Sequence, residues 1–67
     1  MSMSLVEDTL SLLMDGEWHT DEEISKKLGT KKDKVSKVLD FFSRYEFVEY
    51  DAGKRKAKAT NDALMLR

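Results

Sequence analysis

The chain has 67 residues, 40% of them hydrophobic and 37% charged, with a formal net charge of −1 and no cysteine. A chain of this length and composition folds as one domain with a small core, so we expect a single domain over residues 1–67 without a deep catalytic cavity. The lack of cysteine excludes disulfides and thiolate metal sites, and no apolar run approaches the roughly 20 residues that span a bilayer, so we expect a cytoplasmic protein.

The first predicted helix covers about residues 5–14. Ser4 and Glu7 form the S-x-x-E pattern of a capping box, in which each side chain binds a backbone amide of the first turn. Gly16 can adopt the left-handed conformation that ends a helix, and residues 17–19 then form a short extended connection. Apolar residues follow helical spacing at Val6, Leu10, Leu13 and Met14.

The second predicted helix covers about residues 21–28. Thr20 and Glu23 repeat the capping-box pattern, and the acidic first turn, which starts at Asp21, suits the positive end of the helix dipole. This capping role explains the acidic run without a metal ion. Gly29 is expected to end the helix in a left-handed conformation.

The third predicted helix follows at once, with Thr30 as its cap and Asp33 at its third position, and it continues to about Tyr45. Two helices joined by so short a turn must cross sharply, as in a helix-turn-helix. The expected buried stripe has the spacing i, i+3, i+4 and i+7 and consists of Val35, Val38, Leu39 and Phe42.

Two strands are predicted over residues 47–51 and 56–60, with a turn between them in which Gly53 is able to adopt positive φ. Pairing Asp51 with Lys56 places apolar residues on one face of the hairpin and opposite charges on the other. Thr60 then caps a last short turn. One of the apolar residues Leu64, Met65 and Leu66 is expected to return from this turn to the core.

Three segments together resemble winged helix-turn-helix DNA-binding domains of small prokaryotic-type transcriptional regulators: EEISKKLG at 22–29, KVSKVLDFF at 34–42, and FVEYDAGKRKAKAT at 47–60. The resemblance covers nearly the whole chain. It implies an α+β fold with a three-helix core, a C-terminal β-hairpin wing and a short C-terminal helical turn. In such domains the start of the third helix enters the major groove and the wing lies along the DNA backbone.

The charges are divided unevenly along the chain. Residues 1–25 carry seven acidic groups and no basic one, whereas residues 26–67 carry all 12 Lys and Arg against six acidic groups. We expect many of these cations to pair locally at i, i+4 spacing or across the hairpin. The expected pairs are Glu22 with Lys26, Glu23 with Lys27, Asp33 with Lys37, Asp40 with Arg44, Glu49 with Lys58, and Asp51 with Lys56.

Five cations lack a local acidic partner by this reasoning, three at the start of the third helix and two at the hairpin tip. These are the two places that meet DNA in the resembling family, while the acidic first 25 residues are expected largely on other sides. The residues expected at DNA, either from this pairing or from the resemblance, are Thr30, Lys31, Lys32, Lys34, Ser36, Lys37, Lys54 and Arg55.

We therefore expect binding to double-stranded DNA, as a homodimeric transcriptional regulator without a cofactor. The competing interpretation is a protein-interaction module with the same fold, docking through Phe41 and Leu12. Phe41 either packs against its own domain or stays exposed near Tyr45 as a partner contact.

No catalytic or metal site is expected. The chain has no nucleophile elbow, no glycine-rich phosphate loop and no cluster of histidine with carboxylates, so we do not expect an enzyme. The lone histidine, His19, is interpreted as a partly exposed residue before a helix cap rather than as a metal ligand. Trp18 is expected in the core.

Overall fold

A computed structural model describes residues 4–65 of the chain. The elements follow one another as α1 (Leu5–Leu13), β1 (His19–Thr20), α2 (Asp21–Leu28), α3 (Lys32–Arg44), β2 (Val48–Asp51), β3 (Lys56–Ala59) and α4 (Asn61–Leu64). The predicted α+β fold is confirmed, with the expected order of elements. Leu66 lies outside the described residues.

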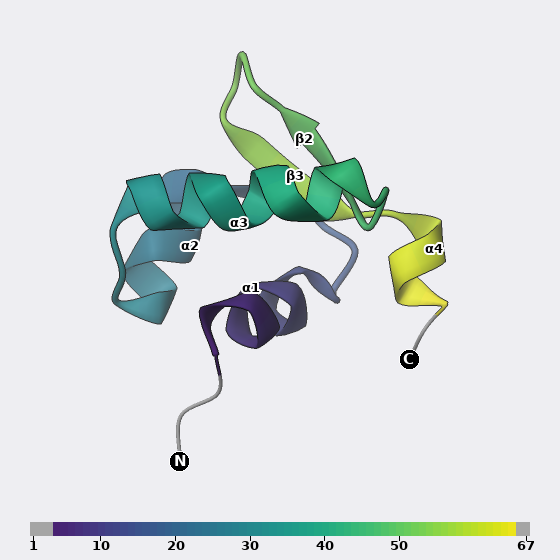
Figure 1. Ribbon diagram of the computed structural model, residues 1–67, viewed down its shortest axis with the longest axis horizontal. Coiled ribbons are helices and arrows are strands. Elements are labelled where there is room, and N and C mark those ends of the chain that lie inside the picture. Colours follow the sequence, from purple (N-terminus) through teal and green to yellow (C-terminus); the bar gives the residue numbers. More distant parts are fainter. Residues whose placement is uncertain (1–3, 66–67) are drawn as a thin grey trace.

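The three long helices pack together, and a small antiparallel sheet of strand order β1-β3-β2 lies beside them (Figure 1). The hairpin of β2 and β3 projects past α3, away from α1. Its register is the predicted one, because Asp51 lies opposite Lys56 and Val48 lies opposite Ala59. The β1 strand adds a pairing of His19 with Ala57, which ties the start of α2 to the base of the hairpin.

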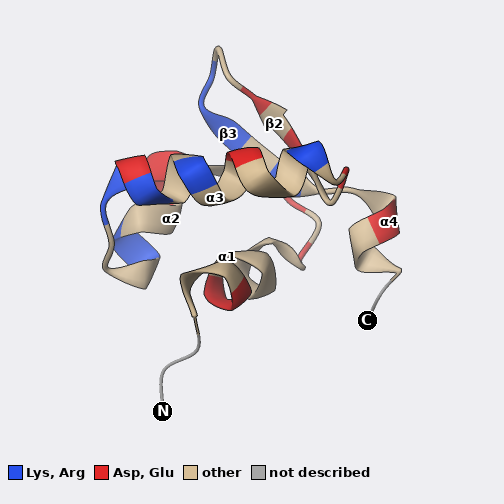
Figure 2. Cartoon of the chain, viewed as in Figure 1, with Lys and Arg blue, Asp and Glu red and all other residues tan. Residues whose placement is uncertain are grey.

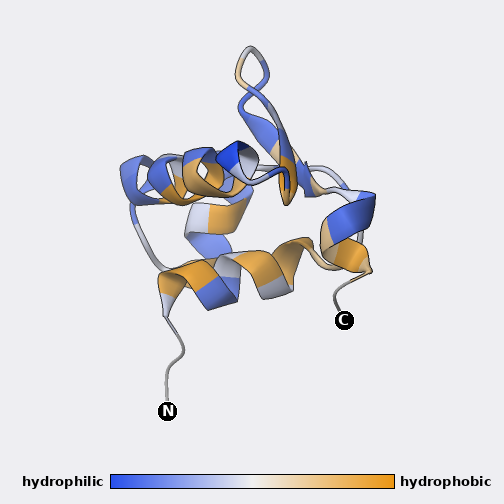
Figure 3. Cartoon of the chain, turned by 45° about the vertical axis from the view of Figure 1, so that its right-hand side comes forward, coloured by the Kyte–Doolittle hydropathy of each residue, from blue (hydrophilic) through white to orange (hydrophobic). Residues whose placement is uncertain are grey.

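The core is built from one face of each helix and the inner face of the hairpin, with the apolar stripes turned inward (Figure 3). Val35, Leu39 and Phe42 are buried as predicted, and Val38 packs at the edge of the core. Leu64 also packs against the core, whereas Met65 is exposed. Val6 has the spacing of a core residue, yet it is exposed near the start of α1.

The helix ends are mostly those expected from the caps. Ser4 and Glu7 form the full capping box of α1, and Gly16 and Gly29 have φ of 79° and 65°. The second predicted capping box, of Thr20 and Glu23, forms only in part. Thr20 accepts a hydrogen bond from the backbone N–H of Glu23, but the Glu23 carboxylate binds His19 instead of returning to the cap.

Two local predictions about turns are wrong. Thr30 does not cap α3; its backbone N–H donates to the carbonyl of Ser25 at 3.0 Å, and Lys31 is the residue before the helix. The left-handed turn at Gly29 uses Thr30 to close α2, which leaves α3 to start one residue later. In the hairpin, the residue with positive φ is Arg55, at 54°, and not Gly53.

Candidate nucleic-acid interface

The start of α3 presents a group of unpaired lysines. Val35 and Leu39 are fully buried and fix the orientation of the helix, so its other face is left to solvent. Among residues 4–65, no carboxylate lies within ion-pair distance of any lysine in this group, and every member is exposed. We call the four residues the α3 lysine cluster: Lys31, Lys32, Lys34 and Lys37.

Four of the six predicted ion pairs form, and they involve other cations. Glu22 and Lys26 are 3.3 Å apart, and Glu23 and Lys27 have the same separation. The other two pairs have separations of 3.1 Å and 3.7 Å and join Arg44 to Asp40 and Lys58 to Glu49. These pairs lower the positive potential on α2, on the end of α3 and at the base of the hairpin, but not at the α3 lysine cluster.

The other two predicted pairs are absent from the described residues. Lys37 has no ion pair with Asp33, and this adds Lys37 to the unpaired group. Asp51 Oδ1 accepts a hydrogen bond from the backbone N–H of Lys54 at 3.1 Å, which closes the hairpin turn. Lys56 lies over the Trp18 ring instead, with its ammonium 4.8 Å from the ring centroid.

Arg55 differs most from the sequence-based expectation, because it has an acidic partner. Its Nε donates to Oδ2 of Asp21 at 2.7 Å, and Asp21 lies 34 residues earlier in the chain. This hydrogen bond and the charge of Asp21 raise the pKa of Arg55. The expected separation of the acidic first 25 residues from the wing is therefore wrong at Asp21, because the start of α2 packs at the wing.

The wing and the start of α3 lie on the same side of the domain. The negative charge of Asp33 in the first turn of α3 also raises the pKa of Arg55, after the larger effect of Asp21. The basic limb of the hairpin and the basic end of α3 are visible together in Figure 2.

The two hydroxyl residues expected at DNA are less well placed. Thr30 is half-buried. The Oγ atom of Ser36 is buried and has no hydrogen-bond partner in the described part of the chain. As it lies, this hydroxyl is not presented to a ligand outside the domain.

The structure also corrects the expected burial of His19 and of Trp18. His19 is only 8% exposed, and it bridges Asp15 and Glu23 at 2.9 Å and 2.8 Å through its two ring nitrogens. Trp18, expected in the core, is 41% exposed. The carboxylates four residues before and after His19 are a signal that could have predicted the buried bridge.

An exposed aromatic pair lies near the end of α3. Phe41 is 48% exposed, and its ring centroid is 5.2 Å from that of Tyr45. Of the two alternatives for Phe41, the structure therefore shows the exposed position near Tyr45. Leu12, the other residue expected at a partner, packs partly buried against the core.

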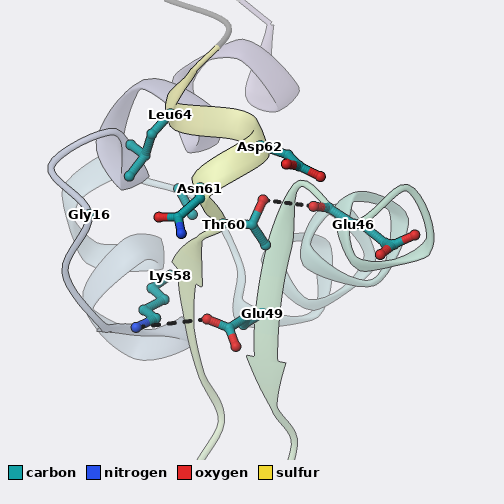
Figure 4. Close-up of a pocket in the computed structure, with 9 residues that line it drawn as sticks. Gly16, Glu46, Glu49, Lys58, Thr60, Asn61, Asp62 and Leu64 are labelled. Carbon is teal, nitrogen blue, oxygen red and sulfur yellow. Dashed lines mark hydrogen bonds and ion pairs between the residues drawn. The ribbon is translucent and has the colours of Figure 1, made fainter.

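A surface hollow of about 490 Å³ lies where the hairpin meets α4 (Figure 4). Its lining contains the Lys58–Glu49 ion pair and the hydrogen bond from Thr60 Oγ1 to the backbone carbonyl of Glu46. No histidine or cysteine lines it, so it does not pair a nucleophile with an imidazole base.

No group of three possible metal ligands occurs within residues 4–65, and no helix there is long and apolar enough to cross a membrane.

Comparison with known proteins shows the fold. No protein-family model and no curated protein matches the chain. The crystal structure of HmgR from Pseudomonas aeruginosa has a TM-score of 0.79 and 19% identity over 92% of this chain. That of an IclR transcriptional regulator from Alicyclobacillus acidocaldarius has a TM-score of 0.78 and 30% identity over the same share. The chain spans only 27% and 26% of those two chains.

Proposed function

We propose that this winged helix-turn-helix domain binds double-stranded DNA and acts as a cytoplasmic transcriptional regulator. The observation that carries the proposal is the α3 lysine cluster, in which Lys31, Lys32, Lys34 and Lys37 are exposed and unpaired while most other cations are paired. A cluster at the start of the helix that enters the major groove in this fold suits phosphate binding. The likeness to the IclR transcriptional regulator supports this function.

In this proposal the lysines contact phosphates on both sides of the groove, and the amino end of α3 adds its dipole. Lys54 and Arg55 contact the backbone or the adjacent minor groove from the wing. Thr30 is half-buried, and in this proposal it contacts a phosphate beside the first lysine. Ser36 contributes only if its hydroxyl turns outward when DNA binds.

The contacts at α3 favour affinity over sequence discrimination. Asp33 and Asp40 are exposed on this helix and repel phosphate. No arginine precedes Arg44 in α3, so the bidentate contact to guanine that dominates specific readout is missing from its first three turns. We therefore expect a modest ratio of specific to non-specific affinity for one domain.

We further propose that the DNA-binding species is a homodimer. A single copy that neutralises about five phosphates binds weakly at physiological salt, and a second copy doubles these contacts. Exposed Phe41 and Tyr45 supply an apolar surface for such pairing. Leu12 contributes less because it packs against its own core. No cofactor is required.

Duplex titration followed by amide chemical shifts tests both proposals. DNA binding should move the amides of residues 31–37 and 54–55, and the shifts should weaken steeply with salt. Dimerisation should move the amides of Phe41 and Tyr45 as the concentration of the DNA-free protein rises. Shifts centred on Phe41 and the surface of α1, insensitive to salt, would instead favour a protein-interaction module.

A further inference from the structure

Two hydrogen bonds hold the wing against the start of α2. The backbone N–H of Asp21 donates to the backbone carbonyl of Arg55 at 2.9 Å, and Arg55 Nε donates to Asp21 Oδ2 at 2.7 Å. One residue of α2 therefore binds both the main chain and the side chain of one wing residue. Arg55 also has φ of 54°, a conformation that residues other than glycine seldom adopt unless their surroundings hold them there.

The contact leaves most of the guanidinium available. Asp21 is almost completely enclosed, with a side chain 5% exposed, whereas the Arg55 side chain is 57% exposed. Only Nε is engaged by a carboxylate within residues 4–65. The two terminal nitrogens carry four further N–H donors, and three of these point away from the edge that Nε–H shares with one of them, since the guanidinium group is planar and rigid.

We propose that Asp21 is a positioning residue that fixes Arg55 at the wing so that its terminal guanidinium nitrogens meet a DNA phosphate or the minor groove. The inference rests on the proposed DNA binding and adds a specific role for a buried carboxylate outside α3. The reason is geometric: a fixed guanidinium loses less side-chain freedom on binding than a mobile one.

Simple electrostatics makes the opposite prediction, and this allows a sharp test. Asp21 carries a negative charge close to the proposed phosphate contacts, so its removal should tighten DNA binding if charge alone matters. If Asp21 positions Arg55, its removal should weaken binding although the protein becomes more positive. The sign of the change therefore separates the two explanations.

The experiment is fluorescence anisotropy with a short labelled duplex and the full chain. We expect Asp21→Asn to weaken binding by roughly threefold to tenfold, the size of one lost charge-assisted contact. The matched control is Glu22→Gln, which removes a neighbouring carboxylate on the same turn whose partner is Lys26. It should leave binding unchanged or tighten it by up to about twofold. Equal tightening by both variants would overturn the proposal.

The same substitutions in an Arg55→Ala background separate positioning from a general effect on folding. Without the guanidinium, Asp21→Asn should no longer weaken binding. Weakening by the same factor in both backgrounds would mean that Asp21 acts through the fold, contrary to the proposal. Far-ultraviolet circular dichroism and thermal unfolding show which variants are folded.

Arg55→Lys gives a second route if the Asp21 variants do not fold. Lysine keeps the charge, but its single ammonium group cannot bind Asp21 through one nitrogen and present other nitrogens to DNA. Binding should therefore weaken about as much as in Asp21→Asn. Binding equal to that of the original chain would contradict the proposal.

In the DNA-free protein, the Arg55 Nε–H resonance should exchange slowly and lose this protection in Asp21→Asn. If the original chain moves no α3 amide with duplex, the proposed function fails instead.

Discussion

His19 joins the connection after α1 to the first turn of α2. Burial lowers its pKa, but hydrogen bonds to Asp15 and Glu23 outweigh this and raise the pKa above its ordinary value. The pKa values of both carboxylates are lowered. For Asp15 the main cause is the hydrogen bond from the backbone N–H of Glu17, followed by the bond to His19. For Glu23 the main cause is the bond to His19. Lys27 also lies close enough to favour both carboxylates in their charged form.

The bridge predicts a defined pH dependence of stability. The contribution of His19 is fully present below its unfolded pKa of 6.5 and is lost as pH rises through its raised folded value. The contributions of Asp15 and Glu23 are present above their unfolded values of 3.8 and 4.5 and are lost as pH falls. Their sum is therefore largest in mildly acidic solution.

We expect His19→Gln to lower the midpoint of thermal unfolding more at about pH 5.5 than at about pH 9, because only the imidazolium can donate to both carboxylates. Thermal melts of both proteins across this range measure the difference. A difference that stays constant, or that grows as the pH rises, would show that the charge of His19 does not matter.

At the residue scale, prediction from sequence worked for most local contacts, although the predicted pair of Asp33 with Lys37 does not form among the described residues. The i, i+4 pairs on α2 and the pair of Asp40 with Arg44 depend only on helix geometry. Asp21 and Arg55 meet only after β1 has paired with β3, which no local pattern indicates. His19 was a different case, because its two carboxylates were in the right positions and the bridge was not inferred.

Among the elements, the turn between α2 and α3 sets the angle at which the α3 lysine cluster is presented. Gly29 closes α2 with φ of 65°, and a Cβ added there would meet nothing within 4 Å. A substitution at this position is therefore opposed by backbone strain alone, without a steric clash.

We expect Gly29→Ala to lower the free energy of unfolding by about 1 kcal/mol, the usual cost of a left-handed conformation with a Cβ. Gly53→Ala is the matched control, because Gly53 has no positive φ and its added Cβ would lie 3.5 Å from Asp51 Oδ1, an ordinary contact. It should change stability by less than about 0.5 kcal/mol. Chemical denaturation measures both. Equal losses would contradict the assigned turn geometry.

At the element scale, the helices and the hairpin register were predicted well. The helices rested on periodicity together with caps. Asp51 opposite Lys56 followed from the alternation of apolar and charged residues. Which residue of the hairpin turn takes positive φ was not predictable in this way. It depends on the bond from Lys54 to Asp51 and on the contact of Arg55 with Asp21, and the second of these is tertiary.

For the whole molecule, a net charge of −1 coexists with a group of exposed lysines at the start of α3. Local pairing cancels the cations of α2 and of the end of α3, and leaves the start of α3 uncancelled. The wing contains one paired and one unpaired cation at its tip. Arg55 forms an ion pair with Asp21, while Lys54 is unpaired among residues 4–65. The acidic first part of the chain therefore balances the total charge and also supplies one contact to the wing.

The central claim is that the unpaired lysines at the start of α3 bind phosphates, and the salt dependence of duplex affinity tests it most directly. Two triple variants remove the same total charge, one from the α3 lysine cluster and one from paired cations. They are K31Q/K32Q/K34Q and K26Q/K27Q/R44Q.

Affinity is measured by anisotropy at several salt concentrations. For the original chain, log Ka against log salt should have a slope of roughly −4 to −5, as expected for about five neutralised phosphates. The first triple variant should bring the slope to about −2, and the second should change it by less than about 1. A slope near zero for the original chain, or equal losses in both variants, would contradict the claim.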